Sequence, residues 1–218
     1  MANDAIILSL DTLKFRWTAA RTMRAYLIGV AADNLGTVQV TEALTSTRIK
    51  HRPNLGRPFS WPLGFDGQII YQRTGGLPDI VRYSLVVVRD RFAVRRAGEI
   101  LSKIANNAEF KRIVAAAQGL AAGTAAAGVA LGVLAPIMNV IGTVLEDVND
   151  RVLDTIDGGM HFDVQDKKKA EHSDTVRSSI ADAEFDFHLF DADIDRESAA
   201  HIKGSMDSLK ESGLLIGS

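Results

Sequence analysis

Cysteine is absent from the 218-residue sequence. Without thiols the chain forms no disulfide bonds, offers no thiolate ligand to zinc and has no cysteine nucleophile. The absence does not identify a compartment, because a reducing cytosol and an exported protein that folds without disulfides both permit it.

The sequence also lacks the short motifs of common enzyme sites. It contains no G-x-S-x-G, no P-loop and no H-E-x-x-H. Ser, His and Asp are present, but a catalytic triad is recognised by geometry, and no spacing here selects one. We therefore expect a protein that is not an enzyme. An enzyme whose site is assembled from scattered residues is the alternative.

Long basic runs and a secretory signal are missing as well. No basic run exceeds Lys167-Lys168-Lys169, so we expect no nucleic-acid partner. Asp4 comes early, and the apolar residues 6–8 are too few for the core of a Sec signal. We expect a cytoplasmic or membrane-associated protein, with non-classical export as the alternative.

Charge is distributed unevenly along the chain. Residues 1–112 carry 17 Lys and Arg against 9 Asp and Glu, whereas residues 146–218 carry 8 against 18. The net charges of +8 and −10 predict a dipolar molecule that stacks on copies of itself or meets an anionic surface. The alternative is ordinary scatter that the folded surface averages out.

Between these two parts, residues 113–145 have no charged side chain at all. Ten of these residues are Ala and five are Gly. Pro136 is expected to divide the stretch, which leaves 23 residues before it, about 35 Å as a helix. That length suits one bilayer crossing. Ala and Gly contribute little to insertion, however, so three interpretations stay open: a helix buried in a soluble fold or assembly, conditional insertion, and a permanent span.

The glycines of this stretch recur at a spacing that favours close helix packing. Gly119 and Gly123 form one small-xxx-small pair, and Gly128 and Gly132 form a second. Because each mid-helix glycine costs about 1 kcal/mol relative to alanine, we expect close packing along these residues to offset the cost. With Pro136 they are the candidate helix-packing or membrane residues.

Residues 1–90 show the period-two alternation of strands, interrupted by turn chemistry. The clearest strand is 80–89, whose apolar run 85–88 predicts a central position in a sheet. Other strands are expected at 5–10, 13–17, 26–32, 37–41 and 68–72.

Residues 51–67 contain three prolines and read as an irregular loop. Phe59, Trp61 and Phe65 lie within it. We expect these aromatic side chains to pack over one end of the sheets. A recognition or membrane-contacting loop is the alternative.

Helical periodicity begins near Arg91, with an amphipathic segment that includes Ile100, Leu101 and Ile104. After Pro136 an apolar stripe through Ile141, Val144, Leu145, Val148 and Val152 predicts a helix over 137–155, ended by Gly158-Gly159. The alternative is a hairpin that pairs 152–156 with 160–164.

The acidic end of the chain predicts a short strand at 160–164, a polar loop at 167–173 and a helix at 196–211. A strand at 185–189 is expected to complete the N-terminal sheets. Asp191, Asp193 and Asp195 form the candidate metal site, since alternating carboxylates suit Ca²⁺. They do not follow the EF-hand pattern, and no other cofactor is expected.

Two segments resemble a known module. Residues 83–100, YSLVVVRDRFAVRRAGEI, and residues 187–204, FHLFDADIDRESAAHIKG, are similar to parts of C2 domains, where an apolar strand leads into acidic loop residues. The resemblance implies a Greek-key sandwich, often one that docks on membranes and sometimes binds calcium. In the first segment Arg89 and Arg91 flank the single acid, a departure that opposes calcium binding there.

Together these patterns predict an α+β protein: an antiparallel, C2-like β-sandwich with an inserted Ala/Gly-rich helical hairpin or helix pair. The expected divisions are 1–90 for most of the sandwich, 91–157 for the helical insertion and 158–218 for the closing strands and last helix. The expected function is membrane interaction through the Ala/Gly-rich helix, as a pore-forming or attachment element. A structural subunit of a homo-oligomer, with that helix buried in its core, is the alternative.

Overall fold

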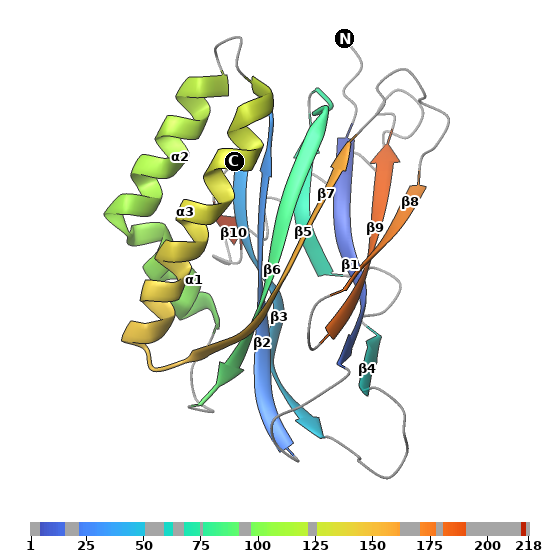
Figure 1. Ribbon diagram of the computed structural model, residues 1–218, viewed down its shortest axis with the longest axis vertical. Coiled ribbons are helices and arrows are strands. Elements are labelled where there is room, and N and C mark those ends of the chain that lie inside the picture. Colours follow the sequence, from blue (N-terminus) through green and yellow to red (C-terminus); the bar gives the residue numbers. More distant parts are fainter. Residues whose placement is uncertain are drawn as a thin grey trace.

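A computed structural model describes residues 5–15, 22–50, 59–62, 68–74, 76–91, 97–121, 126–161, 171–177, 181–190 and 215–216. The chain forms two antiparallel five-stranded sheets and three helices, which confirms the predicted α+β class. The helices lie on the outside of one sheet, and the second sheet lies on the opposite side of the first (Figure 1). The molecule therefore has a helical layer, a middle sheet and an outer sheet.

The outer sheet, called sheet A, combines strands from both ends of the chain. Its strands run in the order β4-β1-β9-β8, and β5 also pairs with β1. The predicted strand at 185–189 lies within β9 and pairs with β1 along its length, so the end of the chain closes sheet A as expected. Its strands are β1 (Ala5–Phe15), β4 (Phe59–Pro62), β5 (Gln68–Thr74), β8 (Glu171–Arg177) and β9 (Ala181–Phe190).

The middle sheet, called sheet B, runs in the order β10-β3-β2-β6-β7. In β6, Leu85 and Val87 join the core that sheet B shares with sheet A. The alternating residues Val86 and Val88 join a second core beneath the helices. The unbroken apolar run of β6 is thus explained by burial on both faces. The strands of sheet B are β2 (Thr22–Asp33), β3 (Val38–Lys50), β6 (Ile80–Asp90), β7 (Arg151–His161) and β10 (Leu215–Ile216).

Three helices connect β6 to β7, which are neighbours in sheet B: α1 (Ala97–Asn106), α2 (Ala108–Ala121) and α3 (Ala126–Asp147). Ile100, Leu101 and Ile104 of the predicted amphipathic segment are buried in α1. α3 packs on β2 and β6 through the apolar residues that follow Pro136. Asn107 begins α2, because its side-chain oxygen accepts the backbone N–H groups of Glu109 and Phe110 at 2.9 and 3.2 Å.

Pro136 does not divide the Ala/Gly-rich stretch, so that prediction is wrong. α3 continues through Pro136, and the described part of the stretch comprises α2, which ends at Ala121, and α3, which begins at Ala126. The proline removes the N–H group that would bond to the carbonyl of Gly132, but both residues are exposed, so water reaches that carbonyl. Burial of Val133, Ile137 and Val140 against the sheet holds the helix together on both sides of the proline.

The predicted helix over 137–155 also ends early. Asn149 adopts a left-handed conformation with φ of 65°, and the backbone N–H groups of Asn149 and Asp150 bond to the carbonyls of Glu146 and Leu145. This Schellman arrangement ends α3 and releases the chain into β7. Both the longer helix and the alternative hairpin are therefore wrong, since β7 runs straight through Gly158-Gly159.

Two predicted loops contain strands. Residues 59–62 form β4, paired with β1, within the stretch read as an irregular loop. The polar loop predicted at 167–173 gives way to β8 at Glu171. In both cases strand pairing supplied by distant residues outweighs unfavourable local composition. The helix predicted at 196–211 lies outside the described residues.

Gly158 and Gly159 occupy the middle of β7 because their cross-strand partners need the space. They pair with Tyr83 and Arg82 of β6, and a Cβ at either glycine would overlap the side chain of its partner. An aromatic side chain that covers a strand glycine in this way compensates for the missing side chain.

We expect Gly158→Ala to lower the free energy of unfolding by about 1–3 kcal/mol, because the added methyl overlaps the buried Tyr83 ring. Urea unfolding followed by tryptophan fluorescence measures the change. Gly98→Ala, at a helical glycine with open space in front of it, is the matched control. Equal stabilities of the two variants would contradict this explanation of the glycine.

Candidate functional sites

The most connected polar group in the described chain is the carboxylate of Asp33, at the end of β2. It is fully buried, and its Oδ1 accepts the backbone N–H groups of Leu35 and Thr37 at 2.9 and 2.8 Å. These bonds shape the turn into β3, where Gly36 has φ of 84°. The turn that the sequence Asp33-Asn34-Leu35-Gly36 predicts is therefore held by hydrogen bonds to the side chain of its first residue.

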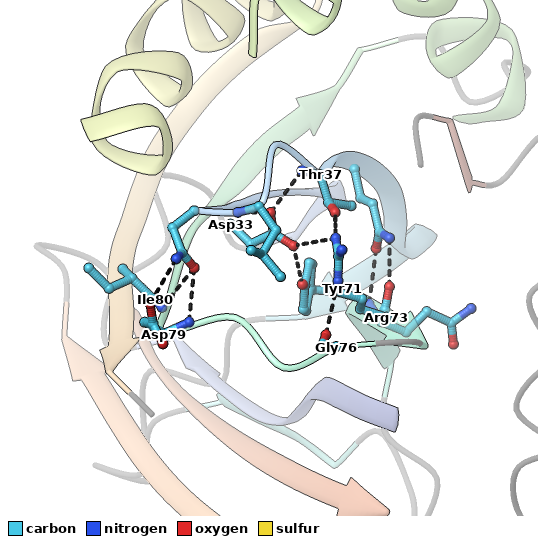
Figure 2. A network of polar contacts seen from close by, with 11 residues as sticks. Asp33, Thr37, Tyr71, Arg73, Gly76, Asp79 and Ile80 are labelled. Carbon is cyan, nitrogen blue, oxygen red and sulfur yellow. Dashed lines mark hydrogen bonds and ion pairs between the residues drawn. The ribbon is translucent and has the colours of Figure 1, made fainter. Parts of the chain in front are cut away.

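The other oxygen of Asp33 bonds across to sheet A. Oδ2 accepts the hydroxyl of Tyr71 at 2.6 Å and the guanidinium of Arg73 at 3.0 Å, and both of these residues belong to β5 (Figure 2). Arg73 also donates to the Thr37 hydroxyl and to the Gly76 carbonyl. The buried charge is thus neutralised and hydrogen-bonded at both oxygens, as a buried carboxylate requires.

Two amide side chains extend this polar cluster. Gln39 of β3 bonds through both ends of its amide to the backbone N–H and carbonyl of Gln72 in β5, at 3.0 and 2.6 Å. Asn34 accepts the backbone N–H groups of Asp79 and Ile80 at 2.9 and 3.2 Å, which ties the turn to the start of β6. We call the set of Asp33, Tyr71, Arg73, Gln39 and Asn34 the inter-sheet clasp.

The clasp is a structural element and not a reactive centre. Each carboxylate oxygen of Asp33 already accepts two hydrogen bonds from the chain, so neither oxygen is left to act on a substrate. Burial raises the pKa of the Tyr71 hydroxyl far above its ordinary value, and the negative charge of Asp33 adds to this effect. Tyr71 is therefore a fixed hydrogen-bond donor.

A groove lies between α3 and the part of sheet B formed by β6 and β7. Its volume is about 520 Å³, within the range of small-molecule sites. Arg82, Ser84 and Asp157 line the strand side, and Leu134, Met138 and Asn139 line the helix side. Ser84 donates its hydroxyl to Oδ1 of Asp157.

Arg82 is the unusual member of this groove. Its Nε atom is buried and has no hydrogen-bond partner in the described part of the chain. A buried donor without an acceptor costs about 1–3 kcal/mol, and more when the group is charged. The side chain lies over Gly159, so the missing side chain at that position is what makes room for it.

Two of the predicted helix-packing glycines stand on exposed helical faces. Gly119 of α2 and Gly132 of α3 are exposed, and no atom of the described residues lies within 4 Å of the position a Cβ would take. Pro136 is exposed on α3 as well. Gly128 belongs to α3, and Gly123 lies outside the described residues.

The remaining candidate residues are only partly covered by the structure. Phe59 and Trp61 belong to β4, where they pair with Phe15 and Leu13 of β1, and Phe65 lies outside the described residues. The carboxylates Asp191, Asp193 and Asp195 also lie outside them. Among the residues that are described, no three His, Asp or Glu side chains come together as a metal site.

Sequence patterns identified neither the clasp nor the groove as a site. The turn at Asp33 and the pair Gly158-Gly159 are both visible in the sequence, but the local pattern at the glycines indicates a helix stop. Tyr71 and Arg73 carried no signal, because their partner is 38 and 40 residues away in the sequence.

We expect Tyr71→Phe to lower the free energy of unfolding at neutral pH by about 1.5–3 kcal/mol, because a bond to a buried charge is lost. The raised pKa of Tyr71 adds a pH dependence. Its stabilising effect is complete below the ordinary pKa of 10.0, and it declines at higher pH because only the unfolded chain loses the proton.

The free energy of wild-type unfolding should therefore fall above pH 10.0 by up to about 1.4 kcal/mol per pH unit more than that of Tyr71→Phe. Urea unfolding across this alkaline range tests the difference. Parallel pH curves for the two proteins would show that Tyr71 ionises normally in the fold.

Comparison with known proteins gives similarity to solved structures alone. No family model and no curated protein matches the sequence. Within the described residues, no helix combines the length and hydropathy needed to cross a membrane. A solved structure described as "Structure of Drosophila C2-DSL-EGF1" is similar with a TM-score of 0.36 and 7% identity, covering 85% of this chain and 67% of that chain. The similarity is weak and partial.

Proposed function

We propose that this protein is a non-enzymatic interaction protein that associates with a second copy of itself through the exposed faces of α2 and α3. The observation that carries the proposal is the open space in front of Gly119 and Gly132. Each glycine costs its helix about 1 kcal/mol relative to alanine, and the described part of the chain places nothing against it. A helix from outside can approach such a surface closely.

The buried side of the helical layer is already occupied. Ile137, Val140 and Val144 of α3 pack on sheet B, and Phe110 and Ala117 of α2 join the same core. Among the described residues of the exposed side, Gly119, Gly132 and Ala135 are small, and Leu120 is a large apolar residue that is 55% exposed. The two sides of the helices therefore have different compositions. Packing on sheet B explains the apolar side, but it does not explain the glycines on the exposed side.

Charge favours a second copy as the partner. Lys111 and Arg112 are exposed near the start of α2, and Glu146 and Asp147 are exposed at the end of α3. The two helices run in opposite directions, so the start of α2 and the end of α3 both lie in the lower half of the helical layer (Figure 1). A twofold axis parallel to the helices would place α2 of one copy beside α3 of the other, with basic residues facing acidic ones.

A membrane surface is the second candidate, because Leu120, Lys111 and Arg112 on α2 combine an exposed apolar side chain with exposed cations. The small residues that dominate both faces offer little apolar area to lipid. They suit the close approach of another helix better, so self-association is the stronger proposal.

Substitution of Gly132 by alanine should change the stability of the subunit and its self-association in opposite directions. Gly132→Ala should raise the stability of the isolated subunit by up to about 1 kcal/mol, because the methyl enters open space in a helix. It should at the same time weaken self-association, because the methyl holds the second helix away. Sedimentation velocity at several protein concentrations and urea unfolding measure the two changes.

Gly98→Ala is the matched control, since it makes the same substitution at an open glycine of α1. Self-association that is unchanged in Gly132→Ala would contradict the proposal, as would a wild-type protein that stays monomeric across protein and salt concentrations. Vesicle co-sedimentation of wild type and Gly132→Glu tests the membrane alternative. A wild-type protein that stays monomeric and binds vesicles, together with a Gly132→Glu variant that does not bind them, would favour the membrane.

A further inference from the structure

The groove beside α3 carries three kinds of chemistry within a small space. Arg82 supplies a cation, Asp157 supplies an anion, and Leu134 and Met138 supply an apolar wall. These groups come from two neighbouring strands and from the helix packed above them. A ligand of the groove has to match all three.

The strand register sets the spacing of the two charges. Ser84 pairs with Asp157, and Arg82 pairs with Gly159, so the four positions form adjacent cross-strand pairs on one face of the sheet. Arg82 and Asp157 are therefore diagonal neighbours, about 7–8 Å apart at the backbone. No ion pair joins them in the described part of the chain.

Each charge has capacity for a ligand. The Nε of Arg82 is packed over Gly159 and buried, so a ligand in the groove meets the remaining guanidinium, which forms no ion pair among the described residues. Asp157 accepts the Ser84 hydroxyl at Oδ1, and no hydrogen bond to its other oxygen occurs among the described residues. A purely anionic ligand would satisfy Arg82 but would be repelled by Asp157, and a purely cationic one would meet the reverse conflict.

We propose that the groove binds a small zwitterion with an apolar body, of the class of the apolar α-amino acids. The ligand carboxylate bonds to Arg82 and the ammonium bonds to Asp157. The apolar side chain lies against Leu134 and Met138, and Asn139 adds a polar contact at the rim. The assignment is independent of self-association, since it uses the strand side of α3 and not the glycine positions.

Isothermal titration calorimetry of the full chain with L-leucine tests the proposal directly. Two analogues of the same shape each remove one charge: 4-methylpentanoate lacks the ammonium, and 3-methylbutylamine lacks the carboxylate. We expect leucine to bind and each analogue to bind at least about tenfold more weakly, because each leaves one protein charge without its partner.

Variants of the groove provide the second arm. Arg82→Gln and Asp157→Asn should each weaken leucine binding at least about tenfold, whereas Arg151→Gln, an exposed arginine of β7 outside the groove, should leave it unchanged. Circular dichroism and thermal unfolding check that each variant is folded.

Three results would overturn the assignment. They are no heat of binding with about 10 mM leucine, binding of either analogue as tight as that of leucine, and unchanged leucine binding in folded Arg82→Gln. The analogue comparison uses only the wild-type chain, so the test stands even if a groove variant fails to fold.

Discussion

Burial of sheet B on both faces is the constraint on which the rest of the structure depends. Its inner face shares a core with sheet A, and its outer face shares a second core with α1 and α3. An antiparallel sheet commonly leaves one face in water, but the unbroken apolar run of β6 does not permit this. The helices between β6 and β7 are therefore required by the strand that precedes them, and Tyr26 of β2 bonds to Asp150 at 2.9 Å where the chain leaves the helices.

The same arrangement produces both proposed interaction surfaces. The helical layer packs on β2 and β6, and the groove lined by Arg82 and Asp157 lies between α3 and the strands β6 and β7. The helices satisfy sheet B with one face only, so their opposite faces, with Gly119 and Gly132, are left for other contacts. The inter-sheet clasp at Asp33 contributes differently, because it fixes how sheet A sits on sheet B at one end through directional polar bonds.

Prediction from sequence succeeded where local periodicity and burial agree. The β6 strand and the amphipathic stripes of α1 and α3 are examples, since their side chains alternate or recur with the period of the element they form. It failed at Pro136 and at Gly158-Gly159, residues that normally interrupt helices and strands. In both places a tertiary contact offsets the local cost: the packed stripe around Pro136 holds α3 together, and the side chains of Tyr83 and Arg82 fill the space above the glycines.

The sequence by itself determined the class of this protein: strands around an uncharged Ala/Gly-rich helical stretch, without thiols or recognisable catalytic motifs. Only the tertiary structure decided that α3 continues through Pro136, that Asp33 meets Tyr71 and Arg73, and that Arg82 shares a groove with Asp157. The physical reason is the separation in sequence between the residues that interact. Periodicity records whether a residue faces a core, whereas the partner of a buried charge depends on which distant strand the register brings beside it.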